Sequence, residues 1–147
     1  MKKVALTAAL IISVMIIMLA VSCKSTPKDA DEQYRNLYDA NTGLDFTGAG
    51  TYTVKEGDTL SDISRHAYND GFYYPIIMLA SRGVVINPDK IRPGMELTIP
   101  DLERNKANVK SRRSMKNCLN GFANIETNKA NPNKGLIEGF RKRADEL

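Results

Sequence analysis

The sequence predicts an α+β fold, in which a strand–helix–helix–strand unit at residues 51–101 precedes a C-terminal helical hairpin. Three observations support this fold class. Residues 51–55 favour β-structure and alternate with period two, which indicates a strand. Residues 60–68 carry apolar side chains at helical spacing. Residues 115–147 carry two further stripes of this kind, separated by a turn-rich break.

The first strand leads into a capped helix. Glu56-Gly57-Asp58 is expected to turn the chain. Thr59 is the expected N-cap, because an acidic residue, Asp62, follows it three positions later. Asn69-Asp70-Gly71 is expected to end the helix. Its buried face is predicted to comprise Leu60, Ile63, Ser64, Ala67 and Tyr68.

A second helix and a second strand complete the unit. Pro75 fits the first turn of a helix, where its missing N–H has no partner to lose. A loop containing Asn87-Pro88-Asp89 and Pro93-Gly94 follows, and residues 95–99 read as a strand. We expect a two-stranded antiparallel sheet with both helices on one face. The buried face of the second helix is predicted to comprise Ile76, Ile77, Leu79 and Ala80.

Three stretches of this unit carry a family pattern. They are YTVKEGDTLSDIS at 52–64, YND at 68–70 and INPDKIRPGMELTIP at 86–100, and together they resemble a LysM domain. The resemblance covers 49 residues, a third of the chain. The chain departs from the family at Ala80-Ser81, where Asn often follows Ala, and at Tyr74, where many members carry Trp. Both departures bear on ligand contacts.

The resemblance implies binding of N-acetylglucosamine-containing glycans of peptidoglycan or chitin in a shallow groove between two loops. Gly57 allows close backbone approach. Leu60 and Ile91 can form an apolar floor for an N-acetyl methyl group, while Asp58, Thr59 and Asn87 can meet hydroxyls. The alternative is that these residues only make turns and caps. The candidate ligand-binding residues are Gly57, Asp58, Thr59, Leu60, Asn87, Pro88, Asp89, Lys90 and Ile91.

Residues 1–22 are predicted to be a lipoprotein signal peptide. Lys2 and Lys3 precede an uncharged apolar run, and Ala20-Val21-Ser22-Cys23 resembles a lipobox, although the position usually held by Leu is Ala20. That resemblance implies cleavage before Cys23 and acylation of this residue, for example with palmitate. We therefore expect a membrane-anchored lipoprotein of the cell envelope that faces the periplasm. The alternatives are a plain signal peptide and an uncleaved anchor.

Residues 23–50 are predicted to be a flexible tether, because the segment contains Pro27, several acidic residues and turn-rich stretches. The spacing of Tyr34, Leu37 and Tyr38 allows one short helix, over residues 31–39. Such a helix is marginal in isolation.

Residues 102–147 are predicted to be a basic helical extension. Residues 101–147 hold eleven bases against six acids, a net charge of +5. The helices either cover the small core of the preceding unit or present a surface to a partner, through attraction to carboxylates or phosphates. Cys118 lies within the first stripe, so burial is favoured over an intermolecular disulfide. The stripes comprise Met115, Cys118, Leu119, Phe122 and Ile125, then Leu136, Ile137, Phe140, Ala144 and Leu147.

Catalysis finds little support in the sequence. His66 is the single histidine, on the polar side of its helix, and no nucleophile has a base beside it. We expect no enzyme activity, no cofactor and no metal. The sequence favours a non-catalytic peptidoglycan-binding lipoprotein that tethers the membrane or a partner to the wall. The alternatives are a protein-interaction adaptor that uses the C-terminal hairpin and a targeting subunit for a separate cell-wall hydrolase.

The expected partners follow from this reading. They are peptidoglycan glycan strands, a lipid bilayer through acylated Cys23 and a protein at the C-terminal helices. Export of the chain excludes nucleic acid.

Overall fold

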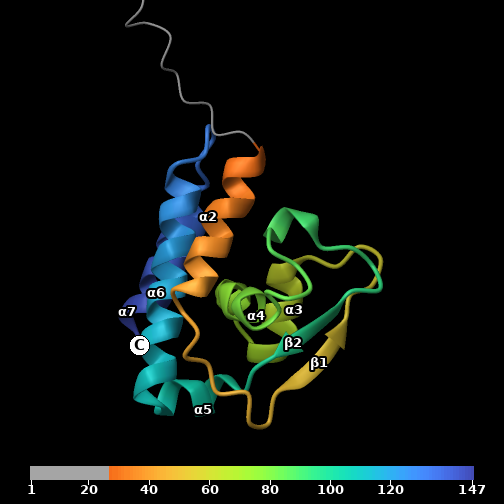
Figure 1. Ribbon diagram of the computed structural model, residues 1–147, viewed down its shortest axis with the longest axis vertical. Helices are drawn as coiled ribbons and strands as arrows, with labels where there is room; N and C mark the ends of the chain where they lie inside the picture. The colour runs from red at the N-terminus through yellow and green to blue at the C-terminus, as the bar shows by residue number, and fades with distance from the viewer. Residues whose placement is uncertain (1–26) are drawn as a thin grey trace, which may run out of the picture.

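The structure is a computed structural model that describes residues 27–147. The predicted signal peptide and the lipidation site Cys23 lie outside the described residues. Figure 1 shows two neighbouring groups of elements: the sheet with α3 and α4, and a layer formed by α2, α6 and α7. This is the expected α+β fold, a strand–helix–helix–strand unit followed by C-terminal helices.

The strand–helix–helix–strand unit matches the predicted order. Strand β1 (Gly50–Thr53) pairs antiparallel with β2 (Glu96–Ile99), with Tyr52 opposite Leu97. Helices α3 (Leu60–Tyr68) and α4 (Tyr74–Ala80) lie between the strands in sequence. Two short 3₁₀ helices, η1 (Gly71–Tyr73) and η2 (Pro88–Lys90), were not expected and occupy the loops.

Helix α3 begins and ends as its sequence predicts. Thr59 is the N-cap, and its hydroxyl accepts a hydrogen bond from the Asp62 backbone N–H at 3.1 Å. Asn69 ends the helix in the left-handed conformation, with φ 56°. Ala67, expected on the buried face, is exposed. Tyr68 is half-buried, and its hydroxyl donates to the Pro100 carbonyl at 3.0 Å.

Helix α4 is the centre of the core. Ile76, Ile77, Met78 and Leu79 are all 0% exposed, so this helix is covered on every side. Strand β2 packs against it, and α6 (Val109–Thr127) covers it from the other group of elements. The buried Cys118 of α6 contacts the Pro75 carbonyl at 3.4 Å. Burial raises the pKa of the Cys118 thiol, because the thiolate loses its hydration.

The C-terminal helices form the expected hairpin and cover the preceding unit. Helix α7 (Lys134–Asp145) packs along α6. Phe122 and Phe140 pack edge to face with each other, with ring centroids 6.0 Å apart, and both contact the ring of Tyr74. Within residues 27–147, no helix combines the length and the apolar character that crossing a bilayer requires.

The expected flexible tether is wrong for the described part of residues 23–50. Helix α2 spans Pro27–Asp39, longer than the predicted short helix, and lies against α6. Tyr34 and Tyr38 are buried, and the Tyr34 ring lies 5.1 Å from that of Phe122. The composition of this segment suggested a tether, but its two tyrosines bury enough apolar surface to hold the helix in place.

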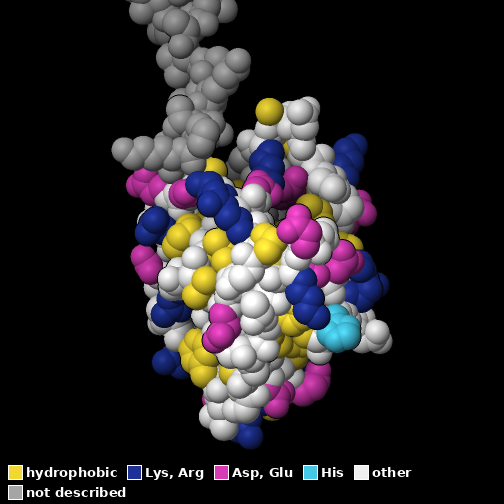
Figure 2. Space-filling view, turned by 90° about the vertical axis from the view of Figure 1, so that its right-hand side faces the viewer, with side chains coloured by type: hydrophobic (Ala, Val, Ile, Leu, Met, Phe, Trp, Pro, Cys, Tyr) yellow, Lys and Arg dark blue, Asp and Glu magenta, His cyan; other side chains and the backbone are white. Residues whose placement is uncertain are grey.

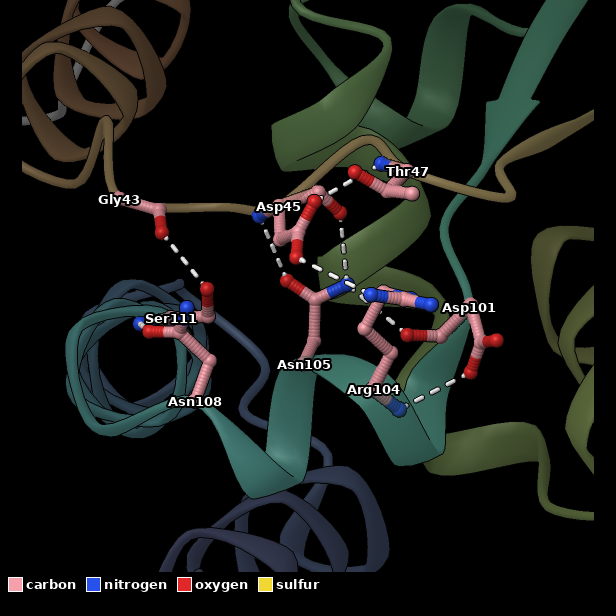
Figure 3. A network of polar contacts seen from close by, with 8 residues as sticks. All are labelled: Gly43, Asp45, Thr47, Asp101, Arg104, Asn105, Asn108 and Ser111. Atoms are coloured by element: carbon pink, nitrogen blue, oxygen red, sulfur yellow. Dashed lines mark hydrogen bonds and ion pairs between the residues drawn. The ribbon is translucent and has the colours of Figure 1, made fainter.

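A buried asparagine fixes the segment between α2 and β1. Asn105, on the short helix α5 (Leu102–Ala107), is 0% exposed. Its side-chain carbonyl accepts from the Asp45 N–H at 2.8 Å, and its amide group donates to the Asp45 and Asp101 carbonyls, each at 2.8 Å. Figure 3 shows this side chain pointing at the extended segment, which Ser111 also holds through the Gly43 carbonyl at 2.8 Å.

We predict that Asn105→Ala lowers the free energy of unfolding by about 3 kcal/mol, because it leaves the part-buried N–H and carbonyl of Asp45 without their partners. Urea denaturation of the full-length chain in mild detergent measures this change. Asn117→Ala is the matched control, since Asn117 is exposed on α6. Equal losses in the two variants would contradict the structural role given to Asn105.

Candidate functional site

A groove of about 270 Å³ lies where the two predicted loops approach each other. One wall comes from the start of α3, and the opposite wall comes from η2 and the residue that follows it. Two further residues, Tyr74 and Leu136, belong to neither loop. The lining residues are Asp58, Thr59, Leu60, Ser61, Tyr74, Pro88, Asp89, Ile91 and Leu136.

The first wall is shaped by a tight turn. Gly57 has φ +82°, a conformation that side chains other than glycine rarely adopt. Asp58 Oδ2 accepts from the Tyr52 hydroxyl at 2.9 Å and from the Lys55 N–H at 2.7 Å. The bond to Asp58 raises the pKa of Tyr52, because the ionised phenol could not donate it. The Thr59 hydroxyl both accepts from and donates to Asp62.

The second wall is held from behind by α2. The amide nitrogen of Asn87 donates to Asp31 at 2.9 Å, and the Lys90 ammonium contacts the same carboxylate at 2.6 Å. The Asn87 side-chain carbonyl accepts from the Asp89 N–H at 2.9 Å, which caps η2. The bonds from Lys90 and then Asn87 hold the pKa of Asp31 below its ordinary value, so this pair is intact at neutral pH and breaks only in acid.

The structure therefore brings six of the nine candidate residues to one groove. They are Asp58, Thr59, Leu60, Pro88, Asp89 and Ile91. Gly57, Asn87 and Lys90 are not among its lining residues. Gly57 makes the turn, Asn87 caps η2, and Lys90 pairs with Asp31. These three residues, and the hydroxyl of Thr59, make the contacts of turn-forming and helix-capping residues, as the alternative interpretation of the sequence predicts.

Three lining residues were not predicted. Ser61 follows the first loop directly, and Tyr74 was noted only as a departure from the family pattern. Leu136 comes from α7, outside the strand–helix–helix–strand unit. No local sequence signal could have placed Leu136 here, because its position depends on how the hairpin packs.

The groove combines an apolar floor with a polar rim. Leu60, Ile91 and Leu136 can contact a methyl group, and Tyr74 adds part of an aromatic ring. Ser61 and the carboxylates of Asp58 and Asp89 can hydrogen-bond to hydroxyl groups. Such a surface suits an uncharged ligand that carries both hydroxyls and small apolar groups. Within residues 27–147, no group of His, Cys, Asp and Glu side chains is placed to hold a metal.

A larger cavity of about 580 Å³ lies elsewhere, beside the C-terminal end of α3. It is lined by Tyr68, Pro100 and Glu103 among others, and by His66, which is exposed and coloured cyan in Figure 2. The polar hydroxyl of Tyr68 is already bound by the Pro100 carbonyl. Volume alone does not make this cavity the better candidate, because neither predicted loop reaches it.

Comparison with known proteins identifies the family of the strand–helix–helix–strand unit. Residues 52–100 match the LysM domain family. The chain is 38% identical over 85 residues to the potassium binding protein Kbp of Escherichia coli O6:H1, covering 58% of this chain and 53% of that protein. It is 39% identical over 82 residues to an uncharacterized protein of Deinococcus radiodurans, covering 56% of this chain and 26% of that protein.

The chain thus spans about half the length of the first relative and a quarter of the second. The family match covers the same residues as the observed unit, from Tyr52 in β1 through β2 to Pro100. LysM domains are binding domains for peptidoglycan and other N-acetylglucosamine-containing glycans. Residues 52–100 of this chain are a LysM domain.

Proposed function

We propose that this protein is a non-catalytic lipoprotein whose LysM domain binds peptidoglycan glycan strands and tethers the membrane, or a partner, to the cell wall. The observation that carries the proposal is the groove itself. Both LysM loops converge on it, and its lining joins an apolar floor to hydroxyl-bonding groups.

The groove chemistry fits an N-acetylated sugar. The methyl of an N-acetyl group packs on Leu60 and Ile91, while ring hydroxyls donate to Asp58 or Asp89. The open groove contacts few atoms of each sugar, so single units bind weakly. Useful affinity then comes from long strands that engage several protein copies on one surface.

The proposed anchor places the domain close to a membrane. Helix α2 begins at Pro27, so three residues separate it from Cys23. Even fully extended, a link of this length spans only about 14 Å. An acylated Cys23 would therefore hold the LysM domain near the bilayer surface in the cell envelope, facing the periplasm. The domain would then bind glycan strands on the side of the cell wall that faces the membrane.

We predict that Ile91→Ala and Leu136→Ala each weaken co-sedimentation of the full-length chain, in mild detergent, with purified peptidoglycan. The expected loss is about fivefold, since each variant removes roughly 1 kcal/mol of apolar contact. Ile137→Ala is the matched control, because Ile137 is also half-buried on α7 but does not line the groove. Soluble N-acetylglucosamine oligomers should release the wild-type protein.

Two outcomes would contradict this proposal. If the wild-type chain stays soluble at every salt concentration, the LysM domain supplies only a scaffold. If Ile91→Ala and Leu136→Ala pellet normally while charge reversal of Arg113 and Lys142 abolishes sedimentation, the exposed basic side chains of the hairpin make the contact. The first result favours the protein-interaction adaptor, and the second moves wall binding from the groove to the hairpin.

A second candidate function is potassium binding, the property in the name of the Escherichia coli relative. The 85 matched residues exceed the 49 of the LysM domain, so the similarity extends into the flanking segments. This candidate predicts a higher melting temperature in KCl than in NaCl at equal ionic strength, because a ligand that binds the native state stabilises it. Identical melting temperatures would exclude it.

A further inference from the structure

Helix α2 lies outside the LysM domain but contacts the loop that forms one wall of its groove. Asp31 and Tyr38 are seven residues apart and therefore share one face of α2. Tyr38 donates its hydroxyl to the Ile86 carbonyl at 2.9 Å, just before the loop. Asp31 accepts from Asn87 at 2.9 Å and from Lys90 at 2.6 Å, within the loop. The helix thus holds the loop at two points.

The contact from Asp31 fixes the orientation of a capping residue. Asn87 is buried, and its amide has one donor end and one acceptor end. The donor end binds Asp31, so the acceptor end faces the Asp89 N–H, which it binds at 2.9 Å. Asp89 and the nearby Ile91 line the groove. Asp31 therefore sets the direction of the loop through Asn87.

Helix α2 can hold the loop in one direction because the helix is itself fixed by packing against α6. Tyr34 and Tyr38 pack on the ring of Phe122, at centroid distances of 5.1 and 6.2 Å. Leu37 lies so close to Gly121 of α6 that any side chain at position 121 would collide with it. A carboxylate on a fixed helix loses little further freedom when it binds, so it orders the loop effectively.

We propose that Asp31 is a positioning residue for glycan binding, which holds the Asn87–Ile91 loop in the shape that forms the groove. The proposal rests on the proposed function for its effect on affinity. A purely stabilising role fits the geometry less well, because the Lys90 end of the ion pair is exposed and Asp31 is only half-buried, and ion pairs this open to solvent contribute little to stability. Removal of the Asp31 carboxylate should therefore change the order of the Asn87–Ile91 loop more than the stability of the fold.

The test compares Asp31→Ala with Glu32→Ala in the full-length chain in detergent. Glu32 is the matched control, since it is the next residue of α2 and is exposed. Amide hydrogen exchange, followed by NMR, reports on loop order at the Asp89 and Lys90 N–H groups, which bond to Asn87. Co-sedimentation with peptidoglycan reports on affinity, and thermal unfolding reports on overall stability.

We expect Asp31→Ala to speed exchange at Asp89 and Lys90 and to weaken sedimentation by about fivefold, with little change in melting temperature. Exchange at the Asp58 N–H, in the other loop, should not change. Asp31→Asn should fall between the wild type and Asp31→Ala, because it keeps an acceptor for Asn87 but loses the charge that binds Lys90. Glu32→Ala should match the wild type in all three measurements.

Unchanged exchange at Asp89 and Lys90 in Asp31→Ala would overturn the proposal. So would faster exchange combined with unchanged sedimentation, since the loop order would then not matter for binding. Failure of the wild type to sediment would refute the proposed function and the affinity claim. In that case, faster exchange in Asp31→Ala would still support Asp31 as the residue that orders the loop.

Discussion

The arrangement of this protein depends on the need to cover α4 on every side. Its seven residues include four apolar side chains with no exposed surface. A two-stranded sheet can cover only one side of such a helix, and α3 contacts it along another. Helix α6 covers the remaining side, with Cys118 against Pro75 and Phe122 against Tyr74. The LysM domain and the C-terminal hairpin therefore share one hydrophobic core.

Sharing a core has consequences for the groove. Packing of α6 against α4 brings α7 to the position where Leu136 reaches the groove lining. It also creates the surface on which Tyr34 and Tyr38 pack, and this holds α2 where Asp31 meets the loop before β2. The site thus combines two loops of a LysM domain with one residue from each flanking segment. A small binding domain gains both stability and shape from the helices around it.

The sequence revealed most of what is local. Period-two alternation placed β1, and the spacing of Thr59 and Asp62 identified the start of α3. The two apolar stripes of the C-terminal hairpin fell on α6 and α7. These features depend on contacts between near neighbours in the chain, which a sequence displays directly.

What the sequence did not reveal depends on long-range packing. The segment of α2 has few apolar residues and many charged ones, so its composition indicated a tether, whereas two buried tyrosines decide its position. The role of Asn87 could not be predicted either, because its partner Asp31 is 56 residues away. The same is true of Asn105, whose side chain binds the backbone of Asp45, 60 residues away.

The most direct test of this account is an NMR titration of the full-length chain, in mild detergent, with a soluble N-acetylglucosamine oligomer. We predict that methyl signals of Leu60, Ile91 and Leu136 shift together and saturate at one oligomer concentration, because these side chains line a single groove. Shifts confined to the larger cavity around His66 and Glu103, or no saturable shift at all, would contradict it.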